Sequence, residues 1–90
     1  MSQPMLGGNI EEMEGMARQF QQRAGQVREV VAALNNEASK VGVAWTGPGA
    51  QRFGEAWQNY RVAFERMAEE LDRASEVIRS YRGNIESATR

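Results

Sequence analysis

The chain contains no cysteine and no histidine. Without cysteine it can form neither a disulfide nor a thiolate metal site. Without histidine it lacks the commonest general base and the commonest zinc ligand. Ser39 and Lys40 do not form a catalytic pair, because neighbours on a helix point about 100° apart. The residues therefore predict no catalytic site, no metal, no cofactor and no enzyme activity.

Long apolar runs and an excess of one charge are also missing. The longest apolar run is VVAAL, residues 30–34, whereas a membrane span needs ~20 residues. The start, MSQPMLGGN, has neither the basic residues nor the apolar segment of a secretion signal. Eleven basic residues are interleaved with twelve acidic ones, which is not typical of a nucleic-acid or lipid surface. Composition alone predicts a cytoplasmic protein with no nucleic-acid partner and no stable membrane insertion.

Ninety residues form one small domain that buries a modest core, so we expect a protein partner. Residues 1–8 have no periodicity and are predicted to be a flexible tail. Asn9, followed by Glu12, is typical of an N-cap, so the first helix should begin near Ile10. We predict an all-α helical hairpin over 9–88, with helices at about 10–45 and 50–88 and a turn at 46–49.

Apolar residues recur at alternating steps of three and four, the 3.5-residue period of a coiled-coil seam. In the first predicted helix they are Met13, Ala17, Phe20, Ala24, Val27, Val31, Leu34, Ala38, Val41 and Trp45. In the second they are Ala50, Phe53, Trp57, Tyr60, Phe64, Met67, Leu71, Ala74, Ile78, Tyr81, Ile85 and Ala88.

The two stripes match when the chain folds back at residues 47–49. Each apolar residue of the first helix then faces one of the second helix, and the two residue numbers add up to 94 or 95. Ala38 and Trp57 are one such pair. Small residues face large ones, as in a well-packed interface. The predicted hairpin core and interface comprises Phe20, Val27, Val31, Leu34, Phe53, Trp57, Tyr60, Phe64, Met67, Leu71 and Ile78. Further apolar residues beside these stripes predict that two hairpins dimerise into a four-helix bundle.

The segment VAWTGPGAQRF, residues 43–53, interrupts the helical pattern. Gly47 is suited to ending one helix, and Pro48 to the first position of the next. Trp45 has two interpretations: a core residue that closes the hairpin, or part of a groove that recognises a partner. The residues alone favour the first. Aromatic residues on the second helix could stack on bases, but their seam spacing favours packing.

The chain resembles the WXG family of small bacterial proteins, also called early-secreted-antigen-like (ESAT-like), which are substrates of type VII secretion. The resemblance is carried by Trp45, Thr46 and Gly47 between two long helices, followed by PGAQRF. It implies hairpins that pair, as homodimers or heterodimers, and leave the cell folded through a membrane translocase driven by an ATPase. The implied partners are a second copy or a related WXG-type chain, and the translocase ATPase. The implied location is secreted or cell-surface, without a cleavable signal peptide.

The resemblance also implies a bipartite export signal. In the family the Trp-x-Gly turn of one subunit lies near a Tyr-x-x-x-Asp/Glu motif of the other. Tyr81 stands in the right region, but Ile85 follows at the acidic position and the nearest acid is Glu86. Either a related partner supplies this half, or the chain tolerates a degenerate motif. We therefore expect an exported dimeric substrate, effector or adaptor module. The alternative is an intracellular structural coiled-coil adaptor whose W-x-G is only a turn.

Overall fold

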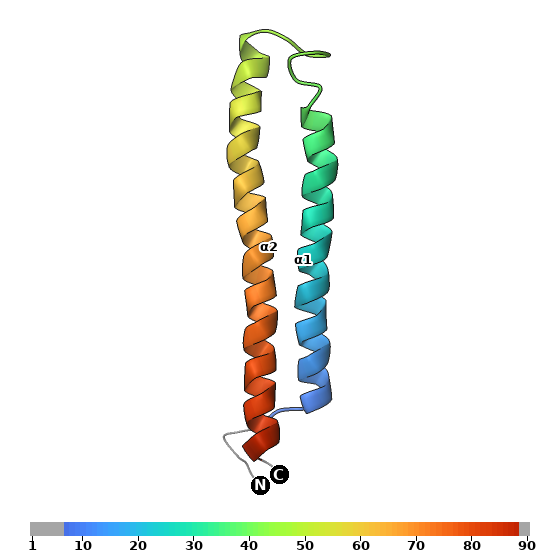
Figure 1. Cartoon of the computed structure of the whole chain (residues 1–90), viewed down its shortest axis with the longest axis vertical. Coiled ribbons are helices and arrows are strands. Elements are labelled where there is room, and N and C mark those ends of the chain that lie inside the picture. Colours follow the sequence, from blue (N-terminus) through green and yellow to red (C-terminus); the bar gives the residue numbers. More distant parts are fainter. Residues whose placement is uncertain (1–6, 89–90) are drawn as a thin grey trace.

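The computed structural model describes residues 7–88, so most of the predicted tail, residues 1–6, lies outside the described part. Two helices, α1 (Ile10–Ala38) and α2 (Pro48–Ala88), run antiparallel side by side and are joined by a loop at one end (Figure 1). The hairpin measures 67 × 17 × 17 Å. This confirms the predicted all-α hairpin.

The starts of both helices agree with the sequence prediction. The side chain of Asn9 accepts a hydrogen bond from the backbone N–H of Glu12 at 3.0 Å, which satisfies an amide that has no partner within the helix. Helix α2 begins at Pro48, and the N–H of Gln51 donates to the carbonyl of Gly47 at 3.1 Å. Gly47 thus precedes the first residue of α2, at a φ of 106° that a residue with a side chain rarely adopts.

The predicted end of the first helix is wrong, because α1 ends at Ala38 and not near residue 45. The Ser39 hydroxyl donates to the carbonyl of Asn36 at 2.6 Å, and the N–H of Val41 donates to Ala38 at 3.0 Å in a tighter turn. Gly42 then has a φ of 94°, which a right-handed helix cannot contain. The connection therefore spans residues 39–47 instead of 46–49.

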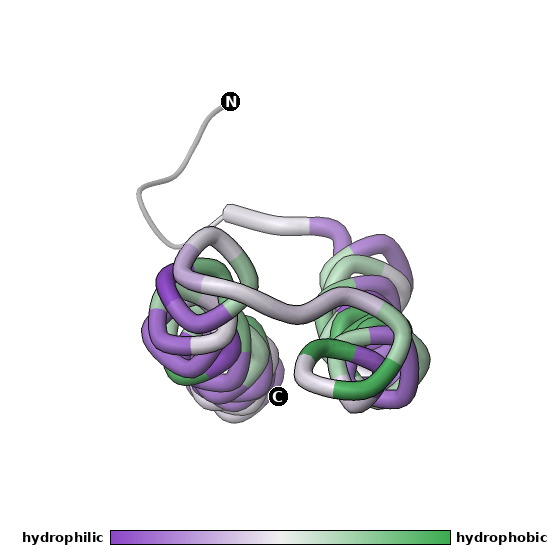
Figure 2. The backbone as a smooth tube through the Cα atoms, turned by 90° about the horizontal axis from the view of Figure 1, so that it is seen from above, coloured by the Kyte–Doolittle hydropathy of each residue, from purple (hydrophilic) through white to green (hydrophobic). Residues whose placement is uncertain are grey.

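Trp45 consequently lies in a loop and is not the last residue of a helical stripe. The N–H of Gly42 donates to the carbonyl of Trp45 at 2.7 Å, which folds the loop back on itself. Viewed from this end, the loop folds over the end of α1 before it crosses to α2 (Figure 2). The Trp45 ring packs against Phe53 of α2 with ring centroids 5.7 Å apart, and Phe53 lies one helical turn beyond Ala50, the predicted partner of Trp45.

The register along the two helices is as predicted. Val27 and Met67, predicted partners, line one hollow between the helices. Met13 and Tyr81 line a second hollow near the chain ends, and Ala38 lies with Trp57 in a third. At these three levels the two helices therefore pair as the matched periods predicted.

Most of the buried residues have small side chains. Ala17 and Ala24 on α1, and Ala68 and Ser75 on α2, are at most 2% exposed. Residues this small allow the two backbones to approach closely. Of the predicted core, only Val31 and Trp57 are buried.

The rest of the predicted core is not enclosed by the hairpin itself. Phe20, Val27, Leu71 and Ile78 are half-buried. The side chains that remain between 37% and 54% exposed are Leu34, Phe53, Tyr60, Phe64 and Met67. The hairpin by itself does not bury these five residues. Their assignment to an interface between chains stays a prediction.

Candidate recognition surface

One edge of the hairpin is closed by polar contacts, which we call the polar edge. Its α1 residues are Glu14, Gln21, Arg28 and Asn35, spaced seven apart. Arg28 pairs with Asp72 at 2.6 Å. The indole N–H of Trp57 donates to the Asn35 side-chain oxygen at 3.0 Å. These residues hold the two helices together along the side where small residues already bring them close.

Several polar contacts of the polar edge converge on Glu14. Arg79 donates to its carboxylate at 3.0 Å, and Nε of Arg82 lies 3.3 Å from it. Arg79 also donates to Gln21 at 3.1 Å. Sequence analysis missed these pairs, although a signal was present: polar residues directly follow Met13, Phe20, Val27 and Leu34 at every seventh position.

The hydrogen bond from Arg79, aided by the positive charges of Arg79 and Arg82, holds the pKa of Glu14 below its usual value of 4.5. A carboxylate with a lowered folded-state pKa stabilises the protein above its unfolded pKa, and this stabilisation is lost as the pH falls through the folded value. We predict that Glu14→Gln lowers the melting temperature at neutral pH. The gap from the native chain should narrow below pH 4.5 in thermal unfolding followed by circular dichroism.

Glu29→Gln is the matched control for this prediction, since Glu29 is exposed on the same helix. Its melting temperature should follow that of the native chain at every pH. A gap for Glu14→Gln that stays constant down to pH 2 would contradict the prediction.

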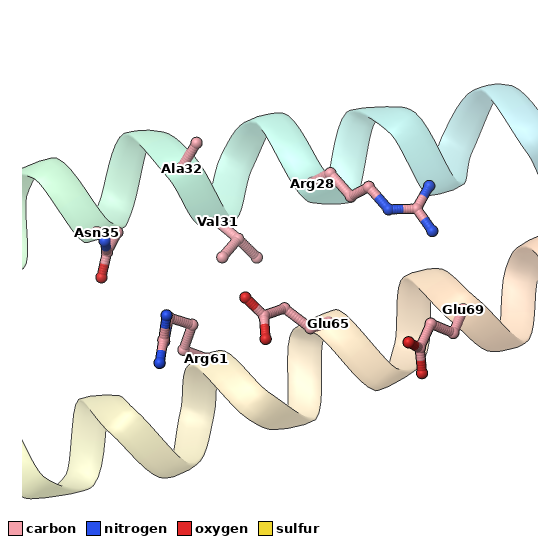
Figure 3. Close-up of a pocket in the computed structure, with 7 residues that line it drawn as sticks. All are labelled: Arg28, Val31, Ala32, Asn35, Arg61, Glu65 and Glu69. Atoms are coloured by element: carbon pink, nitrogen blue, oxygen red, sulfur yellow. The ribbon is translucent and has the colours of Figure 1, made fainter.

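A polar hollow of about 410 Å³ opens on the same edge. Arg61 and Glu65 reach into it from α2, toward Val31 and Asn35 of α1 (Figure 3). Its charged residues are two arginines and two glutamates, so their charges balance. Nε of Arg61 is shielded there and has no hydrogen-bond partner within residues 7–88. The residues that line this hollow have balanced charges and include no nucleophile beside a base. They therefore form no catalytic arrangement.

No cluster of three or more metal-ligating side chains occurs within residues 7–88. Over the same residues, neither helix has the length of uninterrupted apolar sequence that a membrane span requires.

The opposite side of the hairpin is an apolar face. On α1 and α2 it consists of Met13, Met16, Phe20, Val27, Val30, Leu34, Phe53, Tyr60, Phe64, Met67, Ala74, Ile78 and Tyr81. Two hollows indent it: one of about 250 Å³ at the middle of the hairpin and one of about 540 Å³ at the end opposite the loop. Met67 is 50% exposed and Tyr81 62% exposed. A contiguous apolar surface of this kind is typical of a protein-binding face.

The two halves of the expected export signal lie at opposite ends of the molecule. Trp45, 49% exposed, sits in the loop. Tyr81 lines the hollow at the other end with Met13 and Ile85. Tyr81 lies 33 residues after Pro48 on α2, which corresponds to about 50 Å at 1.5 Å per residue. The hairpin therefore does not bring Trp45 and Tyr81 together, and they can meet only between two chains.

Glu86 is the nearest acid after Tyr81. It pairs with Arg82 at 3.4 Å, and Arg82 in turn contacts Glu14 on the polar edge. Ile85 is the residue that accompanies Tyr81 on the apolar face.

The sequence model of the WXG100 family, described as proteins of 100 residues with WXG, matches residues 8–88. The chain belongs to the WXG100 family. The match covers both helices and the loop between them, so it includes Trp45 and Gly47. No curated protein and no solved structure gave a significant match.

WXG100 proteins are small helical proteins that form protein–protein complexes and are not known as enzymes. The apolar face and the exposed loop are therefore the surfaces of this WXG100 chain where its function is best sought.

Proposed function

We propose that this WXG100 chain is exported, as a dimer, by a type VII secretion system and acts by binding other proteins. The observation that carries the proposal is the half-exposed Trp45 in a loop held by two glycines of positive φ. A fold that needed Trp45 only as a core residue would enclose it. Its position instead leaves the indole ring accessible to a second protein.

The dimer is supported by the apolar face, on which the hairpin leaves Leu34, Phe53, Tyr60, Met67 and Tyr81 exposed. A chain of 90 residues gains stability by covering such a surface. In an inverted pair, the loop of one chain lies near the Tyr81 end of the other, as the family resemblance implies. The partner is a second copy or a related WXG-type chain, and the translocase ATPase is the expected export partner.

Export is tested by deleting the translocase ATPase in the source bacterium. We expect the chain to disappear from the culture medium and cell surface and to accumulate inside the cell, measured by immunoblotting of each fraction. A cytoplasmic marker checks for lysis. Undiminished extracellular protein in the deletion strain would refute this route of export.

An intracellular structural adaptor remains the second candidate, and one contact favours it. Trp45 packs on Phe53, and its ring lies close enough to Gly49 that a Cβ there would be 3.7 Å away. The tryptophan therefore contributes to closing the hairpin, as a purely structural turn would require.

A further inference from the structure

We propose that Met67 is a peroxide-sensitive modification site at the middle of the apolar face. While the face is uncovered, hydrogen peroxide oxidises the Met67 thioether to a sulfoxide, and the sulfoxide weakens the binding of another protein to the face. The proposal rests on the proposed function in taking this face as a binding surface. It adds a chemical regulation of that surface.

Methionine is concentrated on the apolar face. The chain contains five methionines and no cysteine. Three of the five lie within residues 7–88, and all three, Met13, Met16 and Met67, belong to the apolar face. Cysteine thiolates and methionine thioethers are the side chains that oxidants commonly modify. Without a thiol, oxidation of the described part of the chain therefore falls first on the apolar face.

Met67 is accessible in the hairpin. It is 50% exposed and lines the hollow of about 250 Å³ at the middle of the apolar face. Its side chain is unbranched and flexible and carries the thioether near its end. Hydrogen peroxide is little larger than water, so it can enter this hollow and reach the sulfur.

Met13 provides an internal comparison, because backbone lies against its sulfur. The segment before α1 crosses toward the C-terminal end of α2 (Figure 1). A Cβ added to Gly8 in this segment would lie 2.9 Å from the Met13 sulfur and 3.1 Å from a methyl carbon of Ile85. The approach of peroxide to Met13 is therefore restricted, and Met67 should be oxidised faster.

The reaction at Met67 is a two-electron oxidation of sulfur. The sulfur lone pair attacks one oxygen of hydrogen peroxide, so that an S–O bond forms as the O–O bond breaks. The proton of the transferred oxygen passes to the departing hydroxide, which leaves as water. The product is methionine sulfoxide, and the peroxide is the only co-reactant.

The sulfoxide makes the middle of the face polar. The hollow that Met67 lines includes the apolar side chains of Val27, Val30 and Phe64. A sulfoxide oxygen buried against apolar side chains is left without its hydrogen bond. Contacts at the centre of an interface lose water most completely, whereas those at its rim stay wet. Oxidation of Met67 should therefore weaken binding about tenfold, and oxidation of Met16, near the end of the hairpin, should weaken it less.

Binding and oxidation oppose each other at this site. A protein that covers Met67 shields the thioether, and the sulfoxide in turn disfavours that protein. Reductases return methionine sulfoxide to methionine by oxidising two thiols to a disulfide, with release of water. The cytosol keeps thiols reduced, whereas the surroundings of secreted proteins are oxidising. Export would thus carry the chain from conditions that keep Met67 reduced to conditions that oxidise it whenever the face is uncovered.

Mass spectrometry after brief treatment of the purified chain with hydrogen peroxide tests access to the sulfur. The chain is first diluted until further dilution leaves the rates unchanged, so that the face is uncovered. Trypsin cuts after Arg66 and Arg73 and releases residues 67–73, whose one methionine is Met67. Fragment ions separate Met13 from Met16. Sulfoxide should form several-fold faster at Met67 than at Met13, and equal rates would overturn the proposal.

Sedimentation equilibrium before and after peroxide treatment tests the effect on pairing. The dissociation constant of the native dimer should rise about tenfold, while the helical circular dichroism signal stays unchanged. Met67→Leu keeps an apolar side chain of similar volume that peroxide does not oxidise, so its constant should change by less than about twofold on treatment. Each variant is compared with itself before treatment.

Met16→Leu is the matched control for Met67→Leu. Met16 is 52% exposed on the same face, and this variant should respond to peroxide nearly as the native chain does. An unchanged dissociation constant after full conversion of Met67 would overturn the proposal. A tenfold rise in Met67→Leu would overturn it as well.

A native chain that is monomeric at every concentration would refute pairing with a second copy and leave the site to be tested by dye binding. The apolar dye anilinonaphthalene sulfonate then replaces the partner. Its fluorescence on the native chain should fall several-fold after peroxide, and should fall far less on Met67→Leu. Equal losses, or none, would overturn the proposal. A peroxide-sensitive dimer that is not exported would instead refute the proposed function and leave Met67 as the sensitive residue.

Discussion

Replacing Trp57 with alanine is expected to unfold the hairpin at 37 °C. Trp57 is 6% exposed and is the largest side chain buried between the helices. Removing a buried tryptophan costs about 3–5 kcal/mol, while a small domain is stabilised by about 5–15 kcal/mol in total. Since a two-helix chain lies at the low end of that range, most molecules of Trp57→Ala should lose their helical circular dichroism signal.

Two variants separate packing from hydrogen bonding at this site. Trp57→Phe keeps most of the apolar contact but loses the N–H that donates to Asn35. That change should cost only about 1 kcal/mol, because Asn35 is exposed and water can replace the donor. A melting temperature for Trp57→Ala within 2–3 °C of the native chain, roughly 0.5 kcal/mol, would show that Trp57 does not hold the helices together.

Replacing Trp45 with phenylalanine is expected to reduce export to background and to leave the fold intact. Phenylalanine retains an aromatic ring against Phe53, a pair worth about 0.5–1.5 kcal/mol, so helicity and melting temperature should change little. It removes the indole N–H and part of a surface that is 49% exposed. Extracellular and cell-associated protein would be compared by immunoblotting in the source bacterium.

Val43→Ala is the matched control for Trp45→Phe. Val43 lies in the same loop and is 83% exposed, so its loss should affect neither folding nor export. If Trp45→Phe is exported as well as the native chain, recognition does not use the indole and the structural interpretation of the W-x-G turn is favoured. If Trp45→Phe instead folds normally and is not exported, Trp57 stabilises the fold and Trp45 is used for recognition.

Local residue chemistry accounts for the parts of the fold that the sequence predicted well. Asn9 caps α1 because its side chain can reach an amide three residues away. Pro48 begins α2 because its missing N–H costs nothing at a helix start. The register followed from matching periods, as Val27 and Met67 illustrate.

The sequence prediction placed the end of α1 too late. Apolar periodicity does not show whether the backbone forms helical hydrogen bonds or those of a loop. Val41 and Trp45 continue the apolar spacing, yet Gly42 between them takes a positive φ. Loop hydrogen bonds such as that from Gly42 to the carbonyl of Trp45 replace those of a helix. A glycine within a periodic run permits either outcome, and the contact of Trp45 with Phe53 favours the loop.

The sequence by itself determined that this chain is an antiparallel pair of helices, because caps, turn residues and a 3.5-residue period act locally. Only the tertiary structure decided which side of each apolar stripe packs against the other helix. Ala68 and Ser75 allow close approach, and Glu14 pairs with Arg79 across the polar edge. The helices therefore turn these residues inward and leave Tyr60 and Met67 exposed. Which edge closes depends on contacts between residues distant in sequence, and that choice creates the apolar face.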